Sequence, residues 1–125
     1  AVFLRSGGKI FVIYVDRARG MALQSAFAGY KAERPLTFEF VAQMLEALEC
    51  SVKSAVIYHV DDGTFFTHMN VEMKNELGSK IVEVDGRPSD TLALALRTNA
   101  PIFVARNVLD NVADMSEAFK KIKGI

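Results

Sequence analysis

The stretch from Lys80 to Ala105 constrains the fold most, because it reads without a break as strand, polar turn, apolar helix and second strand. Lys80 to Val84 reads as a half-buried strand, in which apolar residues are interspersed with polar ones. Leucine and alanine fill residues 92–96, which leaves no polar face and predicts a buried helix. Pro101 then begins a short apolar strand. We therefore expect this helix to lie at the centre of the fold.

The polar turn in front of this helix carries the signals of a helix start. Asp85 and Gly86 end the strand, and Pro88 fits the first helical turn, where its missing N–H has no partner to lose. Ser89 and Asp90 can accept hydrogen bonds from the free N–H groups of that turn. The sequence thus predicts a helix that begins near residue 88.

Length and composition predict one domain, residues 1–125, with a single core. Half of the residues are hydrophobic, so we expect part of the apolar surface to close against another subunit in a homo-oligomer. The longest apolar run, residues 10–15, is too short to cross a membrane. A single cysteine, Cys50, excludes an internal disulfide and suits a cytoplasmic location.

The rest of the chain predicts further strands and helices. Two strands, residues 2–4 and 10–15, flank a Gly7-Gly8 turn, and a helix over residues 19–30 is followed by a second helix capped by Thr37. A long hairpin over residues 51–74 turns at Asp62-Gly63, and Ser116 begins a last short helix. The expected buried helix positions are Leu23, Ala26, Phe27 and Tyr30, then Val41, Met44, Leu45 and Leu48. We predict an α+β domain with a mixed, largely antiparallel sheet packed against helices.

A turn at Asp62-Gly63 sets which side chains of the hairpin share a face, since strand side chains alternate. The predicted core face holds Val56, Tyr58, Val60, Phe65, Met69, Val71 and Met73. The predicted outer face holds Ile57, His59, Asp61, Thr64, Phe66, His68, Asn70 and Glu72.

An internal duplication is a second hypothesis about the fold. An offset of 69 residues aligns Asp16 with Asp85 and Leu23 with Leu92. Each half would then hold a strand, an aspartate and an apolar helix. Chance is the alternative, because any two strand–turn–helix units resemble each other at this level.

The ionisable groups around the polar turn form the first candidate site. Glu83 and Asp85 lie on the same side of their strand, and Asp90 follows on the first helical turn. Converging carboxylates would bind Mg²⁺ or Mn²⁺, which can activate a water molecule, and Arg87 would hold a phosphate. In the alternative interpretation, Ser89 and Asp90 only cap the helix and Arg87 neutralises an aspartate.

The two histidines form the second candidate site. His59 and His68 share the predicted outer face, near Asp61 or Glu72. Two imidazoles with a carboxylate would bind a transition metal or supply a general base. The alternative is that both histidines are surface or interface residues.

The motif DGRPSD at residues 85–90, followed by TLALALRTNAPIFVARNVLD, closely resembles the signature of the bifunctional nuclease (BFN) domain family. The likeness extends to residues 34–37 and 62–65, and more weakly to the GGK…IYV opening, so it covers nearly the whole chain. The resemblance implies a nuclease that acts on both DNA and RNA. It implies catalytic or metal-binding roles for Asp85 and Asp90, and a catalytic role for Arg87 as the phosphate ligand. Glu83 and Glu39 would be catalytic auxiliaries, and Arg87, Ser89, Arg34 and Arg97 would contact the substrate.

The chain departs from the family pattern at two ionisable positions. Phe38 stands where relatives often carry His, and Arg19 stands where they often carry Glu. The net charge is zero, with +4 in residues 1–34 and −6 in residues 35–90. A nucleic-acid-binding protein usually has a surplus of basic groups. The alternative function is therefore a non-catalytic oligomeric binding or assembly module in which the DGRPSD turn is a structural network.

Overall fold

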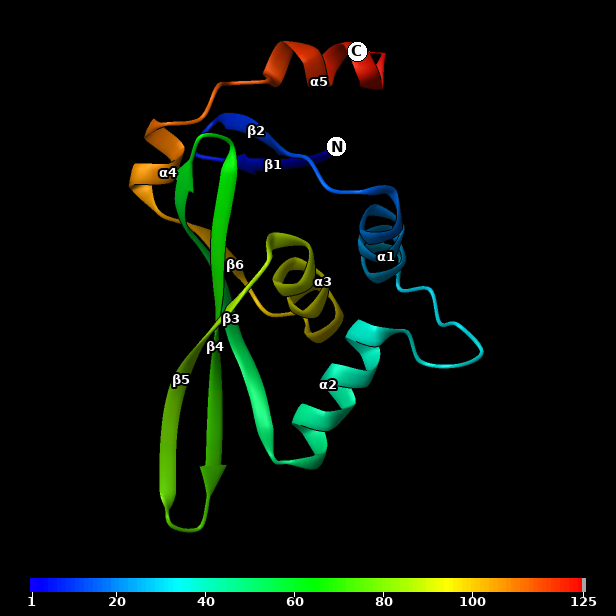
Figure 1. Ribbon diagram of the computed structural model, residues 1–125, viewed down its shortest axis with the longest axis vertical. Helices are drawn as coiled ribbons and strands as arrows, with labels where there is room; N and C mark the ends of the chain where they lie inside the picture. The colour runs from blue at the N-terminus through cyan, green and yellow to red at the C-terminus, as the bar shows by residue number, and fades with distance from the viewer. Residues whose placement is uncertain (125) are drawn as a thin grey trace.

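Two β-sheets form the frame of the computed structural model, which describes residues 1–124 (Figure 1). The strands within this range are β1 (Val2–Ser6), β2 (Lys9–Ile13), β3 (Cys50–Asp61), β4 (Thr64–Asn75), β5 (Gly78–Gly86) and β6 (Ile102–Val104). The helices are α1 (Arg17–Ala28), α2 (Thr37–Ala47), α3 (Pro88–Thr98), α4 (Arg106–Asp110) and α5 (Ser116–Lys123). The predicted α+β class is confirmed.

The larger sheet has the strand order β5-β4-β3-β6 and is mixed, as predicted. β3 runs parallel to β6, and the pairs β3–β4 and β4–β5 are antiparallel. Asp62 and Gly63, which form the predicted turn, both have positive φ, and such turns match the twist of a hairpin. β1 and β2 form a separate two-stranded sheet.

α3 is the central helix, as predicted. Its residues from Thr91 to Ala95 are all at most 6 % exposed, and Ala95 has no exposed surface. The helix lies against α1 and α2 and packs on β3 and β4 (Figure 1). Burial of each leucine contributes about 1.5–3 kcal/mol, so this apolar run organises the core.

A β-bulge in β3 overturns the predicted alternation of the hairpin. Next to the turn the register is as predicted, with His59 opposite Phe66. Ile57 then pairs with Thr67, so Tyr58 has no partner across the strands. The extra residue shifts the following side chains to the other face. Ile57 is therefore buried, at 1 % exposure, and Tyr58 is turned outward, which is the reverse of the prediction.

Two further core assignments of the hairpin are wrong. Val56 lies opposite His68 on the outer face, and Met73 is 39 % exposed. The bulge displaces Val56, and Met73 pairs with Cys50 at the start of β3.

The helix starts and stripes differ in part from the predictions. Leu36, and not Thr37, occupies the N-cap position of α2, and it makes no side-chain cap. α2 buries Phe38, Glu39 and Ala42, whereas the predicted stripe residues Met44 and Leu48 are exposed. On α1 Leu23 is buried as predicted, but Phe27 is exposed, and Tyr30, which lies beyond the end of the helix, is exposed too. The core covers only a narrow strip of each helix.

β5 is exposed along its length, although its sequence predicts a half-buried strand. It forms the edge of the sheet, and with β4 it projects beyond the helices as an arm (Figure 1). Ile81 and Val84 are 62 % and 45 % exposed. An exposed apolar edge strand offers a surface for pairing with another chain.

α5 docks on the β1–β2 sheet, which it requires for its own stability. The N–H of Met115 donates to the Ile10 carbonyl at 2.6 Å, and the Phe119 ring lies 5.2 Å from that of Phe3. Lys9 donates to the Leu109 carbonyl at 2.6 Å and so joins the N-terminal hairpin to α4. No helix within residues 1–124 is long and apolar enough to cross a membrane.

Candidate functional site

A cleft of about 490 Å³ lies where three connections meet. The β2–α1 connection contributes Asp16, the first turn of α1 contributes Arg19, and the β3–β4 hairpin contributes Phe66. The β5–α3 connection contributes Asp85 and Arg87, together with the residues between and after them, Gly86, Pro88 and Ser89. The DGRPSD turn therefore opens into a cleft.

A larger cavity of about 1000 Å³ adjoins this cleft and lies among α1, α2 and α3. Asp16, Arg19, Arg87 and Ser89 line both spaces. Asp85 lines only the smaller cleft, whereas Asp90 lines only the larger cavity. The two predicted carboxylates thus face different spaces, and the two arginines stand between them.

Asp16 caps α1 and pairs with Arg19. Its carboxylate accepts a hydrogen bond from the backbone N–H of Arg19 at 2.8 Å and forms an ion pair with the Arg19 guanidinium. The backbone hydrogen bond, followed by the side-chain bond and the charges of Arg19 and Arg87, holds the pKa of Asp16 below its ordinary value. Arg87 is therefore close enough for its charge to act on Asp16.

Arg87 and Asp90 form a second ion pair at the start of α3. Arg87 Nε lies 3.3 Å from Asp90 Oδ2, and the two side chains are 65 % and 58 % exposed. An exposed pair of this kind contributes little to stability and opens readily. The predicted side-chain caps by Ser89 and Asp90 are absent; Arg87 is the N-cap residue, and Pro88 begins the helix as predicted. The Arg87 guanidinium is thus accessible to an anion.

Two buried threonines hold the DGRPSD turn in place. Thr67 Oγ1 donates to the Gly86 carbonyl at 2.6 Å, and Thr91 Oγ1 donates to Thr67 Oγ1 at 2.8 Å. Gly86 is needed here because a Cβ would lie 2.9 Å from Thr91 Cγ2. The turn is therefore fixed from beneath by hydroxyl groups while its charged side chains face solvent.

Asp85 is exposed and accepts a hydrogen bond from the Tyr58 hydroxyl at 3.2 Å. Partial removal from water, followed by this bond and the charges of Asp85 and Glu83, raises the pKa of Tyr58. Tyr58 thus remains a neutral donor at physiological pH, and Asp85 keeps its other oxygen for a ligand.

The acids do not form a metal cage from protein groups alone. Within residues 1–124, no group of three or more His, Cys, Asp or Glu side chains is arranged to hold a metal ion. Asp90 is paired with Arg87, and Asp85 faces the other space. His59 and His68 share the outer face, as predicted, but aromatic rings lie between them.

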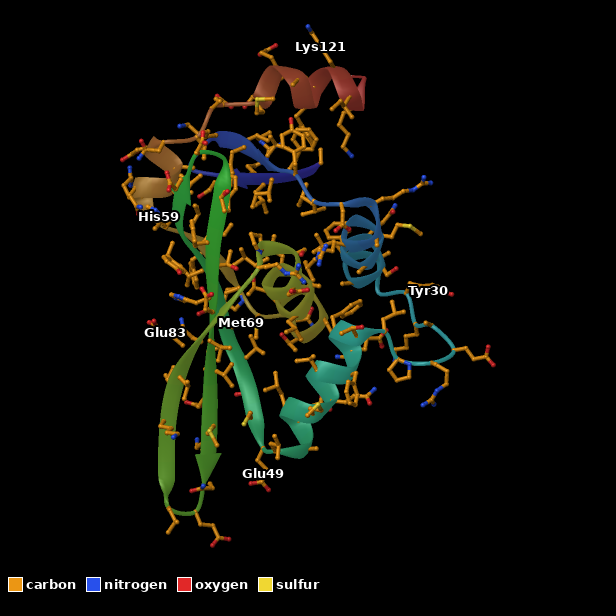
Figure 2. All side chains as sticks on the ribbon, viewed as in Figure 1. Tyr30, Glu49, His59, Met69, Glu83 and Lys121 are labelled. Atoms are coloured by element: carbon orange, nitrogen blue, oxygen red, sulfur yellow. The ribbon has the colours of Figure 1, made fainter. Side chains whose placement is uncertain are left out.

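Four other predicted site residues lie outside both spaces. Glu83 is exposed on β5, on the side of the sheet turned away from α1, α2 and α3 (Figure 2). Arg97 is in the last turn of α3, about 15 Å along the helix from Arg87. Arg34 is exposed between α1 and α2. Glu39 is buried, and its Oε1 has no hydrogen-bond partner within the described residues.

Sequence reasoning did not assign Asp16, Arg19, Phe66 or Thr67 to the site. The duplication hypothesis held a signal for the first of these, because it aligned Asp16 with Asp85. Arg19 was noted only as a departure from the family pattern, yet it adds a second guanidinium to the cleft. No sequence signal identified the threonine pair, since its partners are 24 residues apart.

Comparison with known proteins identifies the family. A family model of the bifunctional nuclease domain matches residues 2–117. The chain belongs to the bifunctional nuclease domain family. It is also 29 % identical over 104 residues to two uncharacterized proteins of Mycobacterium tuberculosis, MT1877 and Rv1829. The match covers 83 % of this chain and 59 % of each relative, so the chain spans about three fifths of their length.

Proposed function

We propose that the cleft binds a phosphodiester of DNA or RNA and hydrolyses it. Family membership supports a nuclease-related function in general. The observation that carries the specific proposal is that two guanidiniums, Arg19 and Arg87, line the same cleft as the exposed carboxylate of Asp85. Guanidinium forks match the oxygens of a phosphate, and the backbone N–H groups at the start of α3 add to the attraction.

Water is the nucleophile in this proposal, because DNA has no 2′-hydroxyl that could attack the phosphorus. Asp85 takes a proton from the water, whose oxygen forms a bond to phosphorus. The bond from phosphorus to the leaving oxygen then breaks, and solvent supplies the proton to that oxygen. Arg19 and Arg87 stabilise the charge that develops on the phosphate oxygens.

Mg²⁺ or Mn²⁺ at Asp85 and Asp90 stays a prediction. The protein groups alone do not complete such a site, so no step above passes through a metal. Mg²⁺ commonly shares one carboxylate with substrate phosphates and water. Cleavage with added metal and with chelator therefore shows whether the reaction depends on a metal.

The test is cleavage of labelled single-stranded RNA and DNA by the purified chain, with Mg²⁺, with Mn²⁺ and with chelator. Asp85→Asn removes the proposed base and should lower the rate by about a hundredfold. Asp110→Asn, the same substitution at an exposed position outside both spaces, is the matched control and should cleave normally. Unchanged cleavage by Asp85→Asn would remove Asp85 from the mechanism.

The second candidate function is a non-catalytic, oligomeric binding or assembly module. The exposed apolar edge of β5 favours it, because Ile81 and Val84 remain uncovered in the single chain. Light scattering at several protein concentrations tests the proposed homo-oligomer, and Ile81→Lys should shift it towards the monomer. An absence of cleavage in every metal condition, with a stable oligomer, would favour the module. A cytoplasmic location, suggested by the single Cys50, belongs to both proposals.

A further inference from the structure

Four aromatic side chains form a continuous row on the outer face of the larger sheet. The rings follow the order His59, Phe66, Tyr58, His68. Successive centroids are 5.3, 6.3 and 5.1 Å apart. We call this set the ring row. It contains both histidines of the second predicted site.

The β-bulge creates the ring row, because it turns Tyr58 outward between its neighbours. Asn107 of α4 donates to the Tyr58 carbonyl at 3.3 Å and so holds the bulge. The Tyr58 hydroxyl, as described above, donates to Asp85 at 3.2 Å. His59 projects from the side of the sheet that α1, α2 and α3 leave uncovered (Figure 2). The row is thus supported from two elements and is open to solvent.

The ring row is continuous with the cleft. Phe66 belongs to the row and also lines the cleft that holds Arg19 and Arg87. Asp85 lines the cleft and is bonded to the row through Tyr58. A row of aromatic rings, of which Tyr58 and His68 are stacked and the others tilted, therefore adjoins two positive groups, and Asp85 contacts both the row and the cleft.

We propose that the ring row is a base-stacking platform for a single-stranded nucleic acid whose phosphates lie at Arg19 and Arg87. This inference rests on the proposed function and names the form of the substrate. Bases of a single strand can stack on aromatic side chains, whereas the bases of a duplex are already stacked on one another. The platform thus selects unpaired DNA and RNA.

The charges around the ring row favour a nucleic acid whose bases, and not its phosphates, lie on the rings. Glu83 and Asp85 border the row on β5 and repel phosphates from it. The uncharged faces of bases meet no such repulsion, and the phosphates are attracted to the guanidiniums of the cleft. Bases on the rings and phosphates at the arginines satisfy both conditions at once.

The test compares two fluorescein-labelled oligonucleotides of about twelve residues, one of thymidines and one of the same length with abasic sites. Fluorescence anisotropy in chelator gives both affinities without cleavage. The native chain should bind the thymidine strand at least about tenfold more tightly than the abasic strand. Phe66→Ala should abolish this preference, so that the two strands bind with the same affinity.

Two further variants keep the test specific. Tyr58→Phe retains the ring and should keep the preference, whereas Tyr58→Ala should lose it. Phe27→Ala removes an aromatic ring that is 81 % exposed on α1, and should have no effect. Circular dichroism confirms that each variant is folded.

Equal binding of the two strands by the native chain would overturn the platform, as would a preference that survives both Phe66→Ala and Tyr58→Ala. A change of oligomeric state in Phe66→Ala would also overturn it, because the face would then be a protein interface. Arg87→Ala should weaken both strands equally. If Arg87→Ala weakens the binding of neither strand while the preference for the thymidine strand persists, the proposed phosphate site in the cleft is wrong. Base stacking on the ring row would then still be supported.

Discussion

The starts of α1 and α3 carry the same two residue types three positions apart, in opposite order. In α1 Asp16 comes first, caps the helix with its carboxylate and pairs with Arg19. In α3 Arg87 comes first, and no side chain caps the helix. Instead, the start of α3 is held by the hydroxyls of Thr67 and Thr91 beneath it.

This difference follows from burial. The first turn of α1 is exposed, so a local side chain must satisfy its N–H groups. α3 begins on the sheet, where tertiary contacts fix the backbone and release the charged side chains for another use. If that is correct, α3 should depend on distant buried groups and α1 on its own cap.

Gly86→Ala should have the largest effect. The new Cβ would lie 2.9 Å from Thr91 Cγ2, within a packed core where the threonine has little rotamer freedom. We expect the free energy of unfolding in urea to fall by about 3 kcal/mol. Adding Thr91→Ser removes that methyl group and should restore most of the loss. A failure of the second change to restore stability would show that a different contact constrains the turn.

Thr67→Val should have the next largest effect on stability, because valine keeps the shape of the side chain and lacks its hydroxyl. The Gly86 carbonyl and the Thr91 hydroxyl would both lose a partner in a buried place. We expect a loss of about 2 kcal/mol in chemical denaturation. Thr64→Val, at an exposed position of the same strand, should change stability by less than about 0.5 kcal/mol. Equal effects of Thr67→Val and Thr64→Val would show that the buried hydroxyl does not hold the start of α3.

Glu39→Met probes the start of α2, which has neither a side-chain cap nor a network of buried hydroxyls. Glu39 Oε1 is buried and has no partner within residues 1–124. Replacing the carboxylate by an apolar group of similar size should raise the free energy of unfolding by about 1 kcal/mol. Glu46→Met, at an exposed position of the same helix, should leave it nearly unchanged. Destabilisation by Glu39→Met would mean that the carboxylate is satisfied in solution.

The cap of α1 should give the smallest effect, and one that depends on pH. Asp16→Ala should lower the thermal midpoint by a few degrees, roughly 3–5 °C, and Asp16→Asn by less, because asparagine also caps helices. The pKa of Asp16 lies below its ordinary value of 3.8 in the folded chain. Its carboxylate therefore stabilises the fold above that value, and this stabilisation is lost as the pH falls through the lowered pKa.

Thermal midpoints of the native chain and Asp16→Asn, measured from about pH 7 down to about pH 2, check this. The difference between them should be constant at neutral pH and vanish at the acidic end. A difference that grows on acidification would show that the ionised Asp16 carboxylate does not stabilise the fold.

Several residues of the candidate site could be predicted from the sequence, but which of them share a cleft could not. Asp85, Arg87 and Ser89 were predicted and do line the cleft. Asp90 was predicted beside Asp85, yet it lines the adjoining cavity, since Asp85 lies at the end of β5 and Asp90 lies on the first turn of α3, where it pairs with Arg87. Sequence spacing places residues along an element, whereas the neighbouring elements decide which space each side chain enters.

Local chemistry determined the central helix, the Asp62-Gly63 turn and the largely antiparallel sheet from the sequence alone. Apolar runs, turn residues and strand alternation act within about ten residues, so they are legible without the fold. Only the tertiary structure decided the bulge at Tyr58, the threonine pair beneath Gly86 and the exposure of β5. Each of these depends on contacts between distant segments, and one inserted residue reverses the faces of a strand.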